Sequence, residues 1–207
     1  IKLMEGKFIT LEGIEGSGKS TSLETISKRL TEEKIEFIVT KEPGGGPLGP
    51  PLRNLLLNKD TKISPQVELL LMMADRKNHL EEIILPNIKK GIWVVSDRYL
   101  DSTYAYQGGG RLLDISQIDK ISEILDLRVP DLTILFDIAP EVSMERAKKR
   151  SDLDRFESEP IDFHKRIRET YLTLAERYNS RFAVVNSSLG FEEVELEVNK
   201  VIDNFIK

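Results

Sequence analysis

The chain has 207 residues, of which 40% are hydrophobic and 31% are charged, and it contains no cysteine. This length suits one elaborated domain with a buried core, and the composition excludes disordered and fibrous proteins. The lack of cysteine excludes disulfides and thiolate metal sites, and the two histidines, His79 and His164, lack the spacing of a zinc-ligand pair.

The charge balance, 30 Lys and Arg against 35 Asp and Glu, gives a net charge of -5 and argues against nucleic acid as the partner. No apolar run approaches the roughly 20 residues of a membrane span, and no signal peptide is recognisable. We therefore expect a cytoplasmic protein with small-molecule partners and no membrane partner. We take Met4 as the native start, residues 1–3 as a remnant of cloning, and residues 4–207 as one domain.

Short runs rich in β-branched residues alternate along the chain with longer amphipathic segments. The runs predict strands at Phe8–Leu11, Phe37–Val39, Ile92–Val95, Leu132–Phe136 and Phe182–Val185. The amphipathic segments predict helices at Thr21–Glu33, Gln66–Lys90, Ile115–Leu127, Glu141–Arg150, Ile161–Tyr178 and Phe191–Ile206. Ser64 and Pro65 suit the start of the second helix, and Gly91 suits its end. This alternation predicts an α/β fold of three layers, a five-stranded parallel sheet with helices on both faces.

In such a sheet, ligands bind at the carboxyl ends of the strands. We predict loops of unusual chemistry there, at Gly13–Ser20, Lys41–Pro51 and Ser96–Arg111. A fourth segment, Lys148–Glu159, is polar and lies between two predicted helices, which is typical of a mobile lid.

The first of these loops carries a complete phosphate-binding motif. Gly13-Ile14-Glu15-Gly16-Ser17-Gly18-Lys19-Ser20 matches G-x-x-x-x-G-K-[ST] and lies between a strand and a helix, the context that the motif requires. Its glycines let backbone N–H groups surround a phosphate, and the helix adds its dipole. We expect Lys19 to bridge the β- and γ-phosphates and Ser20 to offer its hydroxyl to Mg²⁺. The motif predicts a site for a nucleoside triphosphate and Mg²⁺.

The guanine-reading pattern Asn-Lys-x-Asp is missing, since Asn58-Lys59-Asp60 has the wrong spacing, so a GTPase switch is not expected. Asp97 and Arg98 end the third predicted strand on the same edge as the phosphate loop. Asp97 could hold a Mg²⁺-bound water, and Arg98 could grip a second phosphate in bidentate fashion. The alternative is a helix-capping aspartate beside a structural salt bridge.

Further charged residues have both a functional and a structural interpretation. Arg76 lies mid-helix among apolar residues and needs a partner, for which Glu68 and Asp75 are the near candidates. The phosphate loop holds no arginine, so a cation for the moving phosphoryl group must come from elsewhere. The lid offers Lys148, Lys149, Arg150 and Arg155, with Arg146 one turn earlier, unless these side chains simply form a solvated helix end. Glu12 and Glu15 could be solvated or brace the loop, and we favour Glu15 as a hydroxyl acceptor.

Several spaced motifs, taken together, resemble one family. They are Gly13 to Ser20, Glu42-Pro43-Gly44-Gly45, Leu52-Arg53-Asn54-Leu55-Leu56-Leu57, Ala74-Asp75-Arg76, Asp97-Arg98-Tyr99, Ser102-Thr103-Tyr104-Ala105-Tyr106-Gln107-Gly108-Gly109-Gly110 and Leu153-Asp154-Arg155. In this combination and order the chain resembles the bacterial type of thymidylate kinase, from about Lys7 to the C-terminus.

The resemblance implies a P-loop kinase fold, usually paired as a homodimer, that transfers the γ-phosphate of ATP to thymidine monophosphate (dTMP). It places ATP at Gly13 to Thr21 and implies that Lys19, Arg98 and a lid arginine, Arg150 or Arg155, are catalytic. It assigns dTMP to Glu15 at the sugar 3′-hydroxyl, Arg53 and Arg98 at the phosphate, Arg76, Thr103 and Gln107 at the base, and Tyr106 against a ribose 2′-hydroxyl. Mg²⁺ is expected at Ser20 and Asp97, in part through water.

The chain departs from the family pattern at the base site. Met72 stands where relatives commonly stack phenylalanine on thymine, and a thioether covers a base without ring stacking. Lys41, Gly46 and Pro50-Pro51 also replace the usual residues. Two alternatives therefore remain: the same chemistry on another deoxynucleoside monophosphate, and an ATPase switch or binding module that has no phosphoryl acceptor.

Overall fold

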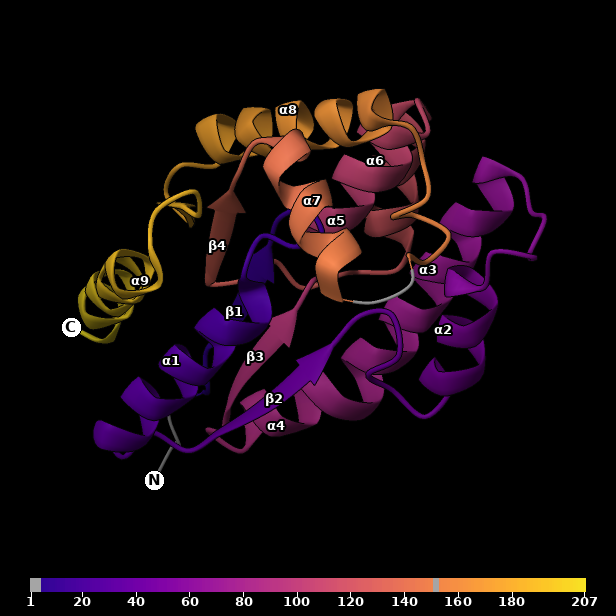
Figure 1. The fold of residues 1–207 in the computed structure, drawn as a ribbon. Helices are drawn as coiled ribbons and strands as arrows, with labels where there is room; N and C mark the ends of the chain where they lie inside the picture. Colours follow the sequence, from indigo (N-terminus) through magenta and orange to yellow (C-terminus); the bar gives the residue numbers. More distant parts are fainter. Residues whose placement is uncertain (1–4, 151–152) are drawn as a thin grey trace.

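The computed structural model describes residues 5–150 and 153–207, except for the side chain of Arg150, so the proposed start at Met4 lies outside the described residues. All five predicted strands are confirmed, and each runs one or two residues further at its carboxyl end. They are β1 (Phe8–Glu12), β2 (Phe37–Lys41), β3 (Trp93–Asp97), β4 (Leu132–Asp137) and β5 (Phe182–Asn186). They form one parallel sheet in the order β2-β3-β1-β4-β5, which confirms the predicted fold class (Figure 1).

The six predicted helices are present with small shifts of their ends. They are α1 (Lys19–Glu32), α3 with η1 and α4 (Pro65–His79, Leu80–Ile84 and Leu85–Lys89), α6 (Ile115–Ile124), α7 (Pro140–Arg150), α8 (Ile161–Arg177) and α9 (Phe191–Ile206). The Ser64 hydroxyl accepts the N–H of Val67 at 3.3 Å and caps α3, as predicted. Gly91 follows the end of α4 with φ of 84°, a conformation that favours glycine. In the part of the chain that the structure describes, no helix is long and apolar enough to cross a bilayer.

Two segments predicted as loops are partly helical. Helix α2 (Gly49–Leu57) begins within the Gly- and Pro-rich stretch, because proline is tolerated in a first helical turn. The segment Ser96–Arg111 forms α5 (Leu100–Thr103) and the π-helical η2 (Tyr104–Gly110). The glycines at the end of η2 permit close packing: a Cβ on Gly109 would lie 2.1 Å from Thr170 of α8.

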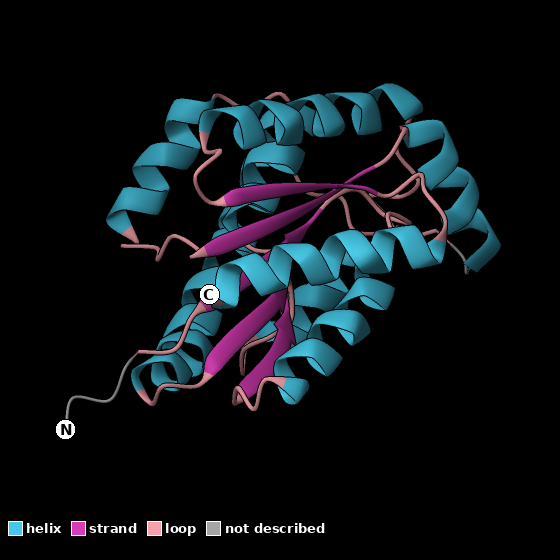
Figure 2. Ribbon diagram, turned by 90° about the vertical axis from the view of Figure 1, so that its left-hand side faces the viewer, coloured by secondary structure: helices cyan, strands magenta, loops and turns pink. Residues whose placement is uncertain are grey.

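The two faces of the sheet bury different residues because side chains alternate along a strand. Ile9 and Leu11 of β1 pack toward α1 and α9, together with apolar residues of β4 and β5. Phe8 lies on the opposite face with η1 and α4, and Leu135 packs there with α8 and η2. Figure 2 shows the twisted sheet with helices on both sides. Glu12, at the end of β1, shares the face of Phe8 and is fully buried beneath α5 and α8.

The strand register brings three chemically distinct segments to one edge. Leu11 of β1 lies opposite Asp97 of β3, and Asp97 lies opposite Lys41 of β2. The backbone N–H of Arg98 donates to the Leu11 carbonyl at 2.9 Å, and that of Glu42 donates to the Asp97 carbonyl at 2.9 Å. Three segments therefore start side by side: the phosphate loop after β1, the Asp97-Arg98 pair at the end of β3, and the loop that begins at Glu42 after β2.

The cap of α3 can be tested by substitution. Ser64→Ala removes the acceptor for the Val67 N–H and should lower the free energy of unfolding by about 1 kcal/mol, as measured by urea denaturation. Ser64→Asp supplies another acceptor and serves as the control. Equal losses in both variants would show that the hydroxyl does not act as a cap.

Candidate active site

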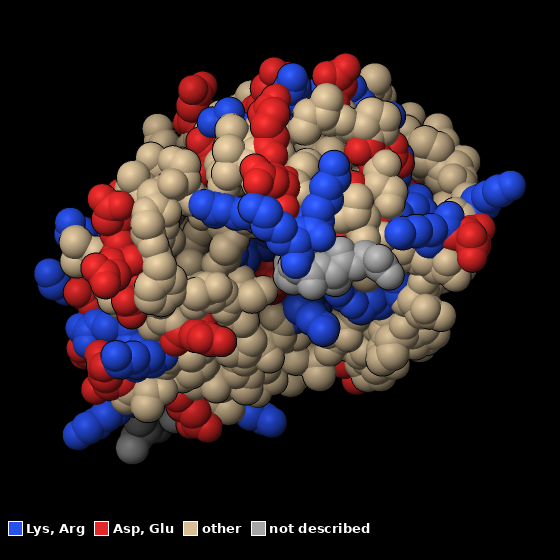
Figure 3. Space-filling view, viewed as in Figure 1, with Lys and Arg blue, Asp and Glu red and all other residues tan. Residues whose placement is uncertain are grey.

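A cavity of about 530 Å³ opens at the carboxyl edge of the sheet. It is lined by the phosphate loop, by the strand-end residues Glu42, Pro43, Asp97 and Arg98, and by side chains of α2, α3, α5, η2 and α7, with Asp154, Phe156 and Glu157 from the predicted lid. Figure 3 shows a hollow on the face seen in Figure 1, with Lys and Arg side chains at its edge. One cavity therefore joins most of the residues singled out in the sequence.

The phosphate loop has the backbone that its glycines were expected to provide. Gly16 and Gly18 have φ of 74° and 85°, and a Cβ on Gly16 would lie 2.5 Å from the Ser143 carbonyl oxygen. The Ser143 hydroxyl of α7 donates to the Glu15 carbonyl, which holds α7 against the loop. Lys19 Nζ is buried and donates to the carbonyls of Gly13 and Ile14, both at 3.0 Å. Burial and the Arg98 charge lower the pKa of Lys19 to about 8.

An ion pair between Arg98 and Glu15 forms part of the cavity wall. Arg98, with φ of 73°, donates through Nη2 to Glu15 Oε1 at 2.9 Å and to the Tyr106 hydroxyl at 3.0 Å. The Tyr106 hydroxyl donates to the same Glu15 oxygen at 2.5 Å, and the Arg98 guanidinium lies over the Tyr106 ring. Burial raises the pKa of Glu15, but the positive charges of Arg98 and Lys19 outweigh this effect and bring the pKa below its ordinary value. Glu15 Oε2 is buried and has no hydrogen-bond partner among the described residues, so it can accept a hydroxyl.

Arg76 is fully buried and paired, but not with the partners considered from the sequence. It donates to Glu42 Oε2 at 2.8 Å, to Thr103 Oγ1 at 2.7 Å and to the Tyr99 carbonyl at 2.9 Å, so the alternatives Glu68 and Asp75 are wrong. The other Glu42 oxygen bonds His79 Nδ1 at 2.8 Å. Spacing along a helix suggested near partners, whereas the cation is neutralised from the end of β2.

The remaining residues predicted for the acceptor side also lie on the cavity wall. Arg53 of α2 donates to the Pro43 carbonyl at 2.8 Å, and Met72 lines the wall beside it. Gln107 Nε2 donates to Glu68 Oε1 at 2.7 Å. The charged Glu68 carboxylate accepts only, so it turns the amide nitrogen of Gln107 toward itself.

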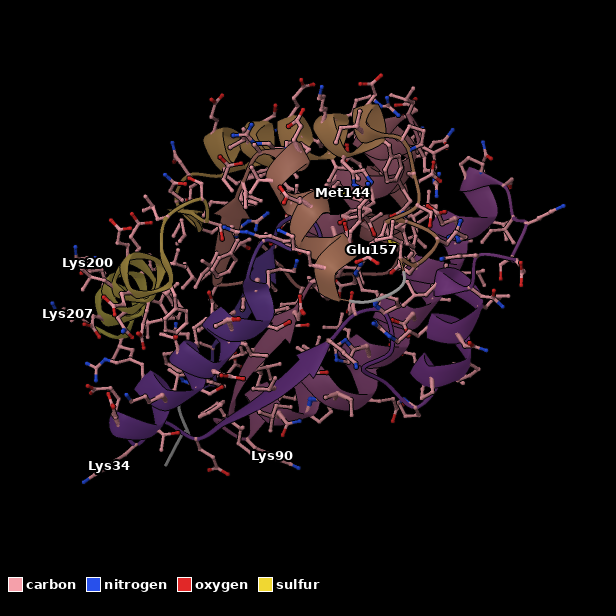
Figure 4. The ribbon with its side chains drawn as sticks, in the orientation of Figure 1. Lys34, Lys90, Met144, Glu157, Lys200 and Lys207 are labelled. Atoms are coloured by element: carbon pink, nitrogen blue, oxygen red, sulfur yellow. The ribbon has the colours of Figure 1, made fainter. Side chains whose placement is uncertain are left out.

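The predicted lid cations lie in different surroundings. Lys148 is exposed, Lys149 pairs with Glu145 at the surface, and Arg146 lines the cavity and donates to the Ser187 carbonyl at 3.1 Å. Arg155 does not line the cavity; it donates to Glu68 at 2.7 Å and to the Leu56 carbonyl at 2.7 Å. The Arg150 side chain lies outside the described part of the structure. Glu157, which is labelled in Figure 4, also lines the cavity.

Sequence reasoning assigned no role to Glu42, Ser102 or Tyr171, although each contacts a predicted site residue. Glu42 pairs with Arg76, and the hydroxyls of Ser102 and Tyr171 lie 3.2 and 3.3 Å from Arg98 Nη1. One signal was available for Glu42: a carboxylate directly after a strand end, at the same edge as a buried arginine that needs a partner. Tyr171 lies on α8, 73 positions from Arg98, and carries no local signal.

The Mg²⁺ expected from the motif has suitable ligands. Asp97 Oδ1 is buried without a hydrogen-bond partner among the described residues, and both Asp97 and Ser20 line the cavity. The described residues contain no cluster of three or more His, Cys, Asp or Glu side chains suited to a metal. This sparse set fits Mg²⁺, which binds through one or two protein oxygens together with substrate phosphates and water.

Comparison with known proteins gives a consistent result. A family model described as thymidylate kinase matches residues 11–198. A thymidylate kinase of Carboxydothermus hydrogenoformans is 46% identical over 201 residues, covering 97% of this chain and 98% of the relative. One from Neisseria meningitidis is 45% identical over 202 residues, covering 97% and 98%. A crystal structure of thymidylate kinase from Ehrlichia chaffeensis has a TM-score of 0.77 at 29% identity, covering 98% of this chain and 100% of that one.

The buried Arg76–Glu42 pair can be tested through stability. Glu42→Ala leaves the Arg76 guanidinium buried without its carboxylate, and we expect a loss of about 3–5 kcal/mol in the free energy of unfolding. The matched control is Glu145→Ala, which breaks an exposed pair with Lys149 and should leave the unfolding curve nearly unchanged. Similar curves for the two variants would contradict the importance of the buried pair.

Proposed function

The chain belongs to the thymidylate kinase family, and on this premise we propose that its cavity transfers the γ-phosphate of ATP to dTMP, giving ADP and dTDP. One observation carries the proposal: a complete phosphate loop shares one cavity with Arg53, Arg76 and Arg98. A single triphosphate does not require three additional arginines. A second bound nucleotide gives them a use, because Arg53 and Arg98 can neutralise its phosphate and Arg76 can donate to its base.

We propose that the donor lies on residues Gly13 to Thr21. Backbone N–H groups of the loop and the start of α1 face the phosphates, and Lys19 leaves its contacts with the Gly13 and Ile14 carbonyls for phosphate oxygens. Ser20 and Asp97 would hold Mg²⁺. When bound, that ion neutralises phosphate charge.

The acceptor phosphate would lie between Arg53 and Arg98. An oxygen of the dTMP phosphate attacks the γ-phosphorus, the bond from that phosphorus to the β,γ-bridging oxygen breaks, and ADP leaves. The nucleophile is already an anion, so positioning and charge neutralisation outweigh general-base catalysis. The unpartnered Glu15 Oε2 is suited to accept the sugar 3′-hydroxyl, and the Tyr106 ring beside it would exclude a 2′-hydroxyl.

For the base, we propose Arg76, Thr103 and Gln107 as the polar contacts and Met72 as the cover. Arg76 donates only, and Glu68 holds the Gln107 amide nitrogen, which leaves the Gln107 carbonyl as an acceptor on the cavity wall. A donor beside an acceptor suits thymine, which offers a 4-oxo group next to an N3–H.

A lid cation would complete the site around the transferred group. The candidates remain Arg150, which ends α7, and Arg155, whose participation requires it to leave Glu68. Arg146 adds a third candidate because it already lines the cavity.

We also propose a homodimer of this single domain, with residues 148–159 as its lid. Leu55 of α2 and Val67 and Leu70 of α3 are exposed apolar side chains on two helices that pack together, which suits an interface between two copies. Absence of cysteine supports placement in the reducing cytoplasm.

The acceptor can be identified with a panel of nucleoside monophosphates. With ATP and Mg²⁺, a coupled ADP-release assay should show turnover with dTMP well above that with dCMP, dAMP or dGMP. Equal rates across the deoxynucleotides would favour a different acceptor. ATP hydrolysis that does not respond to dTMP would favour the ATPase switch.

Removal of either central cation should slow the reaction. Lys19→Ala and Arg98→Ala should each cost about 2–4 kcal/mol of transition-state stabilisation, which is roughly 30- to 1,000-fold in turnover. Circular dichroism should show that both variants remain folded. Lys200→Ala, which removes an exposed cation of α9 outside the cavity lining, is the control. Wild-type rates in Lys19→Ala or Arg98→Ala would overturn the assignment.

A further inference from the structure

A buried carboxylate beneath the acceptor side has no part in the chemistry described so far. Glu12 ends β1 and is 0% exposed. Its Oε1 accepts the backbone N–H of Tyr99 at 2.8 Å. Its Oε2 accepts the hydroxyls of Ser102 at 2.6 Å and Tyr171 at 2.7 Å. The side chain is absent from the cavity lining, so it acts on any substrate only through these neighbours.

The two hydroxyls connect Glu12 to Arg98. Arg98 Nη1 donates to Ser102 Oγ at 3.2 Å and to the Tyr171 hydroxyl at 3.3 Å. A hydroxyl has one proton, and an ionised carboxylate can only accept. When Glu12 is ionised it takes both hydroxyl protons, so the two oxygens are left as acceptors for Arg98. The two hydroxyl oxygens also lie 2.9 Å apart, a contact in which either could donate, and an ionised Glu12 competes with that contact for both of their protons.

The two ends of the Arg98 guanidinium consequently have different roles. Nη1 is held from below by Ser102 and Tyr171, while Nη2 faces Glu15 and Tyr106 on the cavity side. We propose that Glu12 is a positioning residue for phosphoryl transfer, which orients Arg98 through Ser102 and Tyr171 so that Nη2 meets the acceptor phosphate. This inference rests on the proposed function, because it takes Arg98 as the acceptor-phosphate ligand.

The charge of Glu12 supports this role. Burial and the neighbouring Asp101 raise the pKa of Glu12 to about 7, against opposing effects of Arg98 and of the two hydroxyls. Lys19 and Arg181 are the other charged groups that interact with it. Glu12 thus changes charge near neutral pH. Once protonated, Glu12 donates to one hydroxyl, whose own proton must turn away from Glu12 toward the other hydroxyl. The negative charge that made both hydroxyl oxygens stronger acceptors for Arg98 is then lost.

In Glu12→Gln, the effects on stability and on activity should depend on pH in opposite directions. A group whose pKa is raised by folding stabilises the fold fully below its unfolded value, near 4.5, and loses that contribution as pH rises through about 7. Glu12→Gln removes the titration, so any decrease in melting temperature should be smaller at pH 8 than at pH 5. The effect on activity should run the other way and be largest at pH 8.

The decisive experiment measures KM for dTMP and for ATP from pH 6 to pH 8.5 in the wild-type enzyme and in Glu12→Gln. We expect KM for dTMP to rise about 10-fold or more at pH 8, the size of a lost charged hydrogen bond, with KM for ATP nearly unchanged. The variant-to-wild-type ratio should approach 1 at pH 6. Ionisation of dTMP itself is common to both proteins and cancels in this ratio.

Two further variants test the route and provide a matched control. Tyr171→Phe removes one connecting hydroxyl, and its effect should be less than additive with that of Glu12→Gln because both act on Arg98. Asp101→Asn alters an equally buried carboxylate that bonds Arg181 and Thr133 instead. It should leave KM for dTMP unchanged at pH 8. It should also move the pH dependence to lower pH, because a charge that raises the Glu12 pKa is gone.

The outcomes separate this inference from the proposed function. A wild-type enzyme that does not phosphorylate dTMP overturns both. If the wild-type enzyme is active and folded Glu12→Gln has an unchanged KM for dTMP at pH 8, the role of Glu12 alone is overturned. A rise in KM for dTMP in Asp101→Asn equal to that in Glu12→Gln would also overturn it. If Glu12→Gln does not fold, a wild-type KM for dTMP in Tyr171→Phe overturns it instead.

Discussion

The arrangement of the site depends on the ion pair between Glu15 and Arg98, whose Oε1 and Nη2 atoms lie 2.9 Å apart. The pair is possible because β1 and β3 are neighbouring parallel strands with Leu11 opposite Asp97, so that their following loops begin together. It ties the phosphate loop to the end of β3, and the Tyr106 hydroxyl joins it from η2. The proposed donor and acceptor halves of the cavity are therefore held at a fixed separation.

The cavity concentrates buried charges that are nearly all paired. Arg76 pairs with Glu42 and Arg98 with Glu15, while the buried Glu12 interacts electrostatically with both Arg98 and Lys19. Removing such charges from water is costly, and a buried pair is weak evidence for stability. Its use is orientation, because the partners of each guanidinium fix the direction in which that guanidinium faces the cavity. The unpartnered oxygens of Glu15 and Asp97 are the places where such an arrangement is left open to ligands.

Much of this architecture follows from local sequence patterns, and the exceptions have physical causes. The strands, the phosphate loop and the cap of α3 were predictable because each depends on residues close in sequence. The partner of Arg76 was not, because Glu42 is 34 positions away and becomes a neighbour only through the sheet. The run of glycines in η2 is typical of a loop, so its helical structure was not predicted. In the structure, the lack of side chains lets this segment pack closely on α8. The position of Arg155 against Glu68 likewise depends on how the segment after α7 packs against α2 and α3.

The most direct test is a crystal structure of the enzyme with dTMP and a non-hydrolysable ATP analogue. We expect the analogue's γ-phosphate at Lys19 and the dTMP phosphate between Arg53 and Arg98. We also expect the sugar 3′-hydroxyl at Glu15 and the base against Arg76. A dTMP molecule bound away from this cavity, with no phosphate beside Arg53 and Arg98, would contradict this assignment of the site.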